Sequence, residues 1–214
     1  MPMTLRFRIG GIPIEIHPLF WVATLVLAHD RLFEPLHLLS WIVVVSVSIL
    51  LHEMGHALAL RRLGHRPGIE LGATGGMTWA ASRMGLSPLA DILVSLAGPI
   101  AGFMIGVPLT VLGWLLPGLY SVPVLGVFYG DVVFVNVWWG LLNLLPILPL
   151  DGGHVMRAWL RRSWPSVATA RSLQISAGVA GIVALIAFTL GDSFLAVGAG
   201  ALAAYNFSAA RSAK

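Results

Sequence analysis

Two histidines and a glutamate stand at a spacing that holds zinc in hydrolytic enzymes. Residues 52–56 read His-Glu-Met-Gly-His, an H-E-x-x-H motif. On a helix, residues four apart are separated by about one turn, so both imidazoles point to one side and can hold one metal ion. Zinc bound in this way lowers the pKa of its water, and a nearby carboxylate can remove the proton. We therefore expect His52 and His56 to bind one zinc ion and Glu53 to be the general base.

A third protein ligand is expected from another segment, because catalytic zinc sites usually combine three protein ligands with an open position for water. Asp151 is the best candidate, since it follows an apolar segment that ends on the same predicted side as the histidines. Two prolines before it interrupt the helix, and Gly152 and Gly153 after it let the backbone come close to a metal. An isolated Asp-Gly-Gly is most often an ordinary turn. Its predicted depth, and the lack of a third ligand beside the motif, favour the metal site.

The composition indicates the solvent in which these residues work. Of 214 residues, 57% are hydrophobic and only 10% are charged, and the mean hydropathy is +0.88. These values lie outside the usual range of soluble domains and predict a protein of the lipid bilayer. The 13 basic residues form short clusters without interleaved aromatics, so nucleic acid is not the expected partner. The chain has no cysteine, which excludes a thiolate metal site and a cysteine nucleophile.

The sequence contains six apolar segments, of which all but the short first one approach or exceed the roughly 20 residues that a helix needs to cross the hydrocarbon core. They cover approximately residues 18–29, 36–60, 88–116, 123–148, 171–190 and 193–210. The expected fold is therefore an all-α integral membrane protein with about six transmembrane helices, forming a single domain over residues 1–214. The fourth segment contains Asp131 and Asn136 and is broken by prolines, so it needs a protein-lined or wet surrounding.

Two other stretches predict short β-hairpins at the membrane surface. Residues 4–16 alternate apolar and polar side chains around Gly10 and Gly11, and residues 70–79 are too polar and glycine-rich for another crossing. A helical substrate must unwind before cleavage, because its carbonyls are hydrogen-bonded within the helix. The backbone of the second hairpin could pair with the unwound substrate, or the hairpin could merely link two helices. We expect the pairing role.

The orientation follows from the distribution of Lys and Arg. Twelve of the 13 fall on one side of the six predicted segments, and only Arg31 falls on the other. Basic residues are enriched on the cytoplasmic side of membrane proteins. Both termini, and the loops at about 61–87 and 151–171, are therefore expected in the cytoplasm.

The order of the motifs resembles the site-2 protease family of intramembrane zinc metalloproteases. The H-E-x-x-H helix is followed by Ala97-Gly98-Pro99 and then by an Asn-x-x-Pro-x-x-Pro-x-Asp-Gly-Gly run from Asn143 to Gly153. The opening run from Gly11 to Pro18 is similar to the start of the compact prokaryotic members. Neither the PDZ insertion nor the C-terminal regulatory domains of some relatives is expected in this chain.

The resemblance implies one zinc bound by His52, His56 and Asp151, with Glu53 as general base. It implies cleavage, at the cytoplasmic side of a prokaryotic cytoplasmic membrane, of transmembrane protein or peptide substrates that share the lipid bilayer. It also implies that Asn143 binds the substrate carbonyl or its oxyanion. The alternative for Asn143 is an amide that joins neighbouring helices.

Two further positions belong to the comparison with that family. Gly102 stands where many members have Asn, and with Gly98 and Gly106 it forms a stripe of small residues typical of close helix packing. Asn136 lies seven residues before Asn143 and shares its helical face. Its role in catalysis or in helix packing stays open.

A second class of function is a zinc-binding membrane transporter, or an inactive protease relative that binds transmembrane helices. A transporter would distribute its ligands along a path open to both sides, whereas these candidates gather at one depth. An inactive relative would be expected to lack the base, whereas Glu53 is present. Proteolysis is therefore the favoured function, while the substrate and the oligomeric state stay open.

Overall fold

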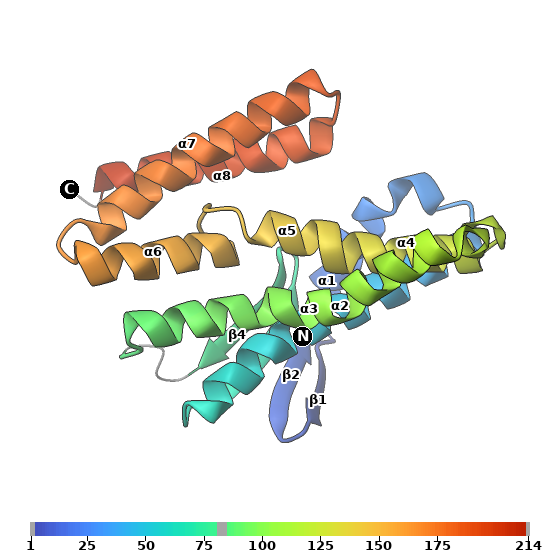
Figure 1. Ribbon diagram of the computed structural model, residues 1–214, viewed down its shortest axis with the longest axis horizontal. Helices are drawn as coiled ribbons and strands as arrows, with labels where there is room; N and C mark the ends of the chain where they lie inside the picture. The colour runs from blue at the N-terminus through green and yellow to red at the C-terminus, as the bar shows by residue number, and fades with distance from the viewer. Residues whose placement is uncertain (1–2, 81–84, 213–214) are drawn as a thin grey trace. The chain divides into compact units, whose positions relative to one another are not determined.

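A computed structural model describes residues 3–80 and 85–212. Most of these residues are helical, and a small sheet accompanies the helices (Figure 1). In chain order the elements are Leu5–Ile9 (β1), Ile12–Ile16 (β2), Pro18–Leu27 (α1), the 3-10 helix His29–Arg31 (η1), Pro35–Arg62 (α2), Pro67–Gly72 (β3), Gly75–Ala80 (β4), Pro88–Leu115 (α3), the 3-10 helix Pro117–Ser121 (η2), Leu125–Val133 (α4), the π-helix Phe134–Trp138 (η3), Trp139–Asn143 (α5), Asp151–Ser163 (α6), Ala168–Thr189 (α7) and Ser193–Ser212 (α8).

The chain forms two compact units, which we describe separately. The first contains residues 1–85 and 97–141, and the second contains residues 86–96 and 142–214. Helix α3 contributes its first turns to the second unit and the rest of its length to the first.

Both predicted hairpins are present, and they join in one sheet. Gly10 and Gly11 form the β1–β2 turn with φ angles of 56° and 84°, in the left-handed region that favours glycine. The strand order is β1-β2-β3-β4, in which β2 and β3 run parallel and the other pairs antiparallel. The sequence predicted the two hairpins but not their union, because parallel pairing joins strands that are far apart in the chain.

The buried face of the sheet packs against the C-terminal part of α2. Ile14, Ile69 and Leu71 of the sheet form one buried cluster with Ala57 of α2 and Phe20 of α1. Figure 1 shows β1 and β2 beside this part of α2. Side chains alternate between the two faces along a strand, so the apolar side chains of one face all pack against the helix. The sheet therefore fixes the turns of α2 that carry the H-E-x-x-H motif.

Helix α1 is shorter than the first predicted crossing. Its 10 residues extend about 15 Å at 1.5 Å per residue, roughly half of the hydrocarbon core. The apolar run stops there because His29, Asp30 and Arg31 form a polar 3-10 turn. In the described part of the chain, five helical segments are long and apolar enough to cross a membrane: α2, α3, the segment from α4 to α5, α7 and α8. The expected count of about six becomes five long segments and one short helix.

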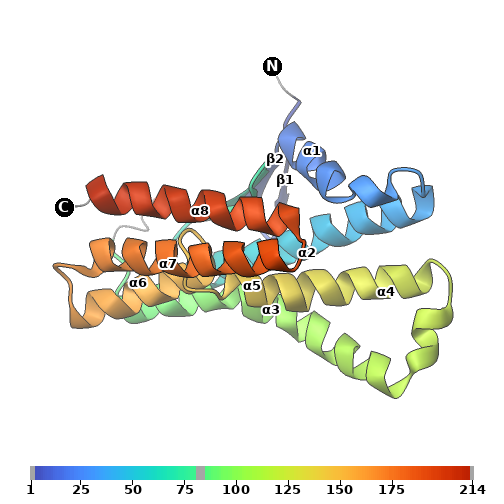
Figure 2. The same cartoon turned by 90° about the horizontal axis from the view of Figure 1, so that it is seen from above.

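The parallel pairing constrains the path of α1 and α2. Figure 2 shows α1 running out from the sheet and α2 running back to it. Strand β2 ends just before α1, and β3 begins just after α2, and the main-chain N–H of His17 donates to the carbonyl of Leu71 (2.9 Å). The two hairpins must therefore lie at the same end of α2, whichever way the chain is oriented in the membrane.

Large apolar side chains cover the outside of the long helices. Met104 on α3, Phe188 on α7 and Val197 on α8 are each 73% exposed. Only 22% of the apolar span in α7 and 17% of that in α8 is buried. Extended apolar surfaces of this kind are stable in hydrocarbon rather than in water. The predicted integral membrane fold with a small sheet is confirmed.

The fourth predicted helix, 123–148, is shorter than expected. It begins at Leu125, passes through η3 without interruption and ends at Asn143. Pro146 follows closely, and a proline disfavours helical backbone at the residue before it and cannot donate a helical hydrogen bond. The π-helix η3 lies at the middle of this segment and contains Asn136.

In the second unit, α6 occupies a stretch that was predicted to be a loop. The helix contains three arginines and separates apolar from polar side chains around its axis, so it is amphipathic rather than apolar. Arg161 donates to the carboxylate of Asp91 (3.3 Å) and to the carbonyl of Leu86 (3.0 Å), at the start of α3. The high charge of this stretch hid the helix from an analysis based on apolar runs.

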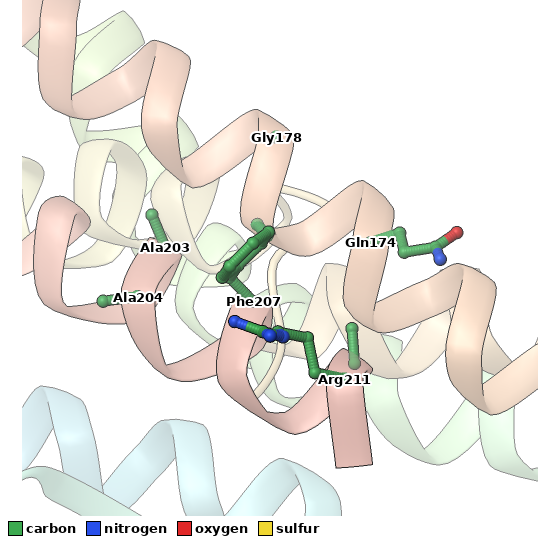
Figure 3. Close-up of a pocket in the computed structure, with 8 residues that line it drawn as sticks. Gln174, Gly178, Ala203, Ala204, Phe207 and Arg211 are labelled. Carbon is green, nitrogen blue, oxygen red and sulfur yellow. The ribbon is translucent and has the colours of Figure 1, made fainter. Parts of the chain in front are cut away.

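Helices α7 and α8 form the predicted tight hairpin (Figure 2). The turn contains Gly191 with a φ angle of 81°. A groove of about 720 Å³ runs along the hairpin, and Gly178, Phe207 and Arg211 are among the residues that line it (Figure 3). The described residues that line it include no imidazole and no carboxylate, so it is not a candidate metal site.

Asp131 on α4 is only 4% exposed and is held from two other elements of the first unit. Arg31 donates to one carboxylate oxygen (2.7 Å), and Ser40 on α2 donates to the other (3.0 Å). The guanidinium of Arg31 also lies over the ring of Trp41, 4.9 Å from its centre. The protein-lined surrounding expected for Asp131 is therefore present. Arg31, the one basic residue on its predicted side, is the partner of a buried carboxylate.

Replacing Arg31 with methionine is expected to destabilise the fold by about 3–5 kcal/mol, because Asp131 would remain buried without its cation. The measurement is the unfolding midpoint in mixed detergent micelles. The exposed Arg62 offers a matched control, since Arg62→Met removes a cation without leaving a buried anion. The double variant Arg31→Met, Asp131→Leu should recover part of the loss. Equal midpoints for Arg31→Met and Arg62→Met would contradict a stabilising role of the pair.

Candidate metal centre

His52, Glu53 and His56 lie together on α2, and their ligand atoms are all within 4.8 Å of one another. Glu53 and His56 are buried, at 6% and 4% exposure. The Nε2 atoms of the two histidines are 3.1 Å apart. Two Zn–N bonds of about 2.05 Å at a tetrahedral angle would place these nitrogens about 3.3 Å apart. The donor set and its spacing therefore fit a zinc ion.

Two glycines set the distance between α2 and α3 at this centre. A Cβ atom on Gly55, inside the motif, would lie 2.4 Å from the carbonyl oxygen of Ala97. A Cβ on Gly98 would lie 2.3 Å from Nε2 of His56 and 2.8 Å from Nε2 of His52. Carbon atoms do not approach other heavy atoms this closely without displacement. Gly98 therefore leaves open the space into which both ring nitrogens point.

The rest of the small-residue stripe on α3 packs against the fourth segment, as the sequence indicated. A Cβ on Gly102 would lie 3.3 Å from the carbonyl oxygen of Asn136, and one on Gly106 would lie 2.6 Å from a methyl group of Val137. The side-chain amide of Asn136 donates to Ser48 on α2 (2.8 Å) and to the carbonyl of Val132 (2.9 Å). These contacts give Asn136 a role in joining helices.

Glu53 is held from the other side by β4. The hydroxyl of Thr78 lies 2.6 Å from the carboxylate Oε2 of Glu53 and 3.0 Å from its main-chain oxygen. Gly76 lies against the same side chain, since a Cβ there would be 2.5 Å from Cγ of Glu53. The sequence predicted a role for the backbone of this strand alone. The contact with Thr78 was missed, because no local pattern shows which strand residue meets the helix.

The remaining predicted site residues, Asn143 and Asp151, belong to the second unit. Asn143 is the last residue of α5 and is partly buried. Asp151 is the first residue of α6 and is also partly buried. The structure thus brings the motif residues together in one unit, and it places the other two at the helix ends on either side of one irregular stretch.

The glycines after Asp151 have a packing role that was not predicted from the sequence. A Cβ on Gly152 would lie 2.0 Å from the carbonyl oxygen of Leu144, and one on Gly153 would lie 2.5 Å from the backbone of Ile147. Both glycines therefore let the start of α6 pack on the preceding irregular backbone. Their close approach is to the chain itself, and it fixes the position of Asp151 relative to residues 144–148.

Two buried polar residues from the α7–α8 hairpin hold that irregular backbone. The main-chain N–H of Leu148 donates to the hydroxyl of Ser176 (2.9 Å), and the side-chain amide of Asn206 donates to the carbonyl of Leu148 (2.7 Å). Ser176 and Asn206 are both fully buried (0%). They were not predicted from the sequence, although isolated polar residues in apolar helices were the available signal.

Comparison with known proteins agrees with this arrangement. Residues 124–187 match the model of peptidase family M50. A zinc metalloprotease of Methanocaldococcus jannaschii is 28% identical over 196 residues, which are 86% of this chain and 52% of that protein. The putative zinc metalloprotease Rip3 of Mycobacterium tuberculosis is 34% identical over 152 residues, which are 70% of this chain and 37% of that protein. The resemblance of this chain to the site-2 protease family is therefore confirmed by a match to peptidase family M50.

A solved structure, the site-2 protease from Methanocaldococcus jannaschii, has the same fold. The match has a TM-score of 0.65 at 24% identity and covers 99% of this chain and 95% of that chain. This chain spans about half or less of the length of the two curated relatives. The family match contains Asn143 and Asp151, and the H-E-x-x-H motif lies before it. The relatives' names and the His-Glu-His cluster agree on zinc as the metal.

Gly98→Ala is expected to reduce zinc retention at least tenfold, because the new methyl group would occupy the space in front of both imidazole nitrogens. Zinc per chain in purified protein, after dialysis against a weak chelator, is the measurement. Gly130→Ala on α4 is the matched control, since a Cβ there meets nothing within 4 Å. Full zinc occupancy in Gly98→Ala would show that the metal does not lie between α2 and α3.

Proposed function

We propose that this chain is an intramembrane zinc metalloendopeptidase of the site-2 protease type. It hydrolyses a peptide bond in or near the transmembrane segment of membrane-protein substrates. The observation that carries the proposal is the cluster of His52, Glu53 and His56 on an apolar helix, in which Glu53 and His56 are buried. Ionisable groups are costly at membrane depth and usually mark a functional site. Asp151 completes the set of ligands for one zinc per chain.

The residues divide the chemistry between them. Zinc, when bound, would act as the Lewis acid and activate water for attack. Glu53 accepts the proton of the attacking water and delivers it to the leaving amine, which is the usual cycle of a general base. Asn143 donates its side-chain amide to the oxyanion that develops on the substrate carbonyl. The relatives' names support zinc proteolysis and not transport, so the transporter alternative is not favoured.

The substrate is proposed to bind to β4 in extended form. Strand β4 is at the edge of the sheet formed by the described strands, and Thr78 and Gly76 place it directly beside Glu53. An edge strand offers unpaired N–H and C=O groups that can replace the helical hydrogen bonds lost when a substrate unwinds. The cleaved bond would then lie next to the base.

Glu53→Gln is expected to retain zinc but to lose cleavage by at least about a hundredfold, because an amide keeps the shape of the side chain and cannot accept the proton. His56→Ala and Asp151→Ala are expected to lose both zinc and cleavage. Zinc content and cleavage of single-pass substrates, co-expressed with each variant, are measured together. Normal cleavage by Glu53→Gln would exclude it as the base, and full zinc occupancy in both ligand variants would exclude the ligand set. Zinc transport by a chain that cleaves no substrate would favour the transporter.

We further propose a prokaryotic cytoplasmic membrane as the location, with both termini and the sheet in the cytoplasm. The distribution of basic residues supports this orientation. The paired hairpins support one side for residues before His17 and after Arg62. Substrates would then be cut at the cytoplasmic end of the bilayer.

Single cysteines in this cysteine-free chain are expected to report the orientation. Arg66→Cys, just before β3, should resist a membrane-impermeant thiol reagent in intact cells and react after lysis. Gly118→Cys, in η2 at the other end of α3, should react in intact cells. Both positions are exposed, so protection by the protein itself does not account for a difference. The reverse pattern would show that the sheet lies outside.

A further inference from the structure

The contact between β4 and Glu53 uses a side chain that the proposed chemistry has not yet employed. Thr78 is 5% exposed, and both oxygens within reach of its hydroxyl belong to Glu53: Oε2 at 2.6 Å and the main-chain oxygen at 3.0 Å. A hydroxyl has one proton and donates to one acceptor at a time. Either choice joins the strand to the same residue of α2. When the carboxylate is ionised, the shorter contact is a charge-assisted hydrogen bond.

Gly76 completes the surface against which the Glu53 side chain lies. Residues two apart in a strand face the same way, so Gly76 and Thr78 both face α2. A Cβ on Gly76 would lie 2.5 Å from Cγ of Glu53 and 2.6 Å from Oε1. The strand therefore leaves space for the Glu53 side chain at Gly76 and provides a hydrogen-bond donor to it two residues later, at Thr78. Thr78 holds the other oxygen of the carboxylate, Oε2.

The register of the sheet shows which way the backbone of Thr78 points. The carbonyl of Leu71 accepts from His17, so Leu71 faces β2, and its neighbour Glu70 faces β4. Glu70 is the register partner of Met77. Main-chain groups alternate in direction along a strand. Those of Met77 are therefore used by β3, and those of Thr78 point outward from the edge of the sheet.

We propose that Thr78 is a positioning residue that couples substrate binding on β4 to the orientation of Glu53. This inference rests on the proposed protease function. The backbone of Thr78 pairs with the extended substrate while its hydroxyl holds Oε2 of Glu53. A substrate strand on the edge keeps Thr78 extended, and so keeps the hydroxyl on the carboxylate. The base is then aligned while a substrate is in register.

Two substitutions separate the hydroxyl from the shape of the side chain. Thr78→Val preserves the volume and β-branching of threonine but removes the donor, whereas Thr78→Ser retains the donor. Thr74→Val, in the exposed β3–β4 loop, is the matched control for the same chemical change. We expect Thr78→Val to keep its zinc and lose about tenfold or more in kcat with little change in KM, because a misaligned base loses part of its contribution. Thr78→Ser should stay within about threefold of the unsubstituted protein, and Thr74→Val should match it.

A third variant tests the edge without touching the base. Ala80 lies two residues after Thr78, so its N–H also points outward, and Ala80→Pro removes this donor. We expect Ala80→Pro to raise KM and largely retain kcat, whereas Thr78→Val should lower kcat and leave KM nearly unchanged. Wild-type kcat in Thr78→Val, or equal losses in Thr78→Val and Thr78→Ser, would overturn the role of the hydroxyl. Loss of zinc from Thr78→Val would assign the residue a structural role instead.

Hydrogen exchange of the metal-free protein gives a second measurement that needs no cleavage. Amide exchange over residues 75–80 should be faster in Thr78→Val than in Thr78→Ser or Thr74→Val, because the strand loses its bond to α2. Unchanged exchange in Thr78→Val would overturn the coupling. If the unsubstituted protein cleaves no transmembrane substrate, the proposed function fails, and the exchange comparison still decides whether Thr78 holds β4 to Glu53.

Discussion

The structure depends on the requirement that a carboxylate and two imidazoles on an apolar helix be kept from lipid. A buried charge without a partner costs several kcal/mol, so every neighbour of the motif must shield or satisfy it. The sheet folds back on α2 and supplies Thr78 to Glu53. Helix α3 approaches from another side, and its contact is close enough that only glycine fits at Gly55 and Gly98. The sheet and the glycine contact thus both serve the same buried cluster.

Local spacing carried most of what the sequence predicted. The H-E-x-x-H motif, the Gly10-Gly11 hairpin and the protein-lined surrounding of the segment that contains Asp131 were all predicted from short patterns, and each has its counterpart in the structure. The pairing of β2 with β3 and the bond from Thr78 to Glu53 join distant segments, and their register is set only when the sheet packs on α2. Helix α6 was missed for another reason, because its amphipathic pattern lies in a charged stretch between apolar runs.

The position of Arg31 is explained by the structure and not by the distribution of basic residues across the membrane. It was the single exception to that one-sided distribution. In the structure it is bonded to Asp131 and lies over Trp41, so its position is set by a buried ion pair. The return of the chain from β2 to β3 then gives an independent reason for placing both hairpins on one side. That reason does not depend on whether the 10-residue α1 crosses the bilayer.

The second unit meets a related requirement with backbone groups. Between Asn143 and Asp151 the chain is irregular, and the groups it frees cannot face hydrocarbon. Ser176 and Asn206, on the α7–α8 hairpin, satisfy both main-chain groups of Leu148, three residues before the proposed ligand. The α7–α8 hairpin is apolar on its outside, and its buried polar residues form hydrogen bonds with the irregular backbone. Side chains from neighbouring elements hold the candidate site in each unit: a threonine fixes the proposed base, and a serine and an asparagine fix the backbone leading to the third proposed ligand.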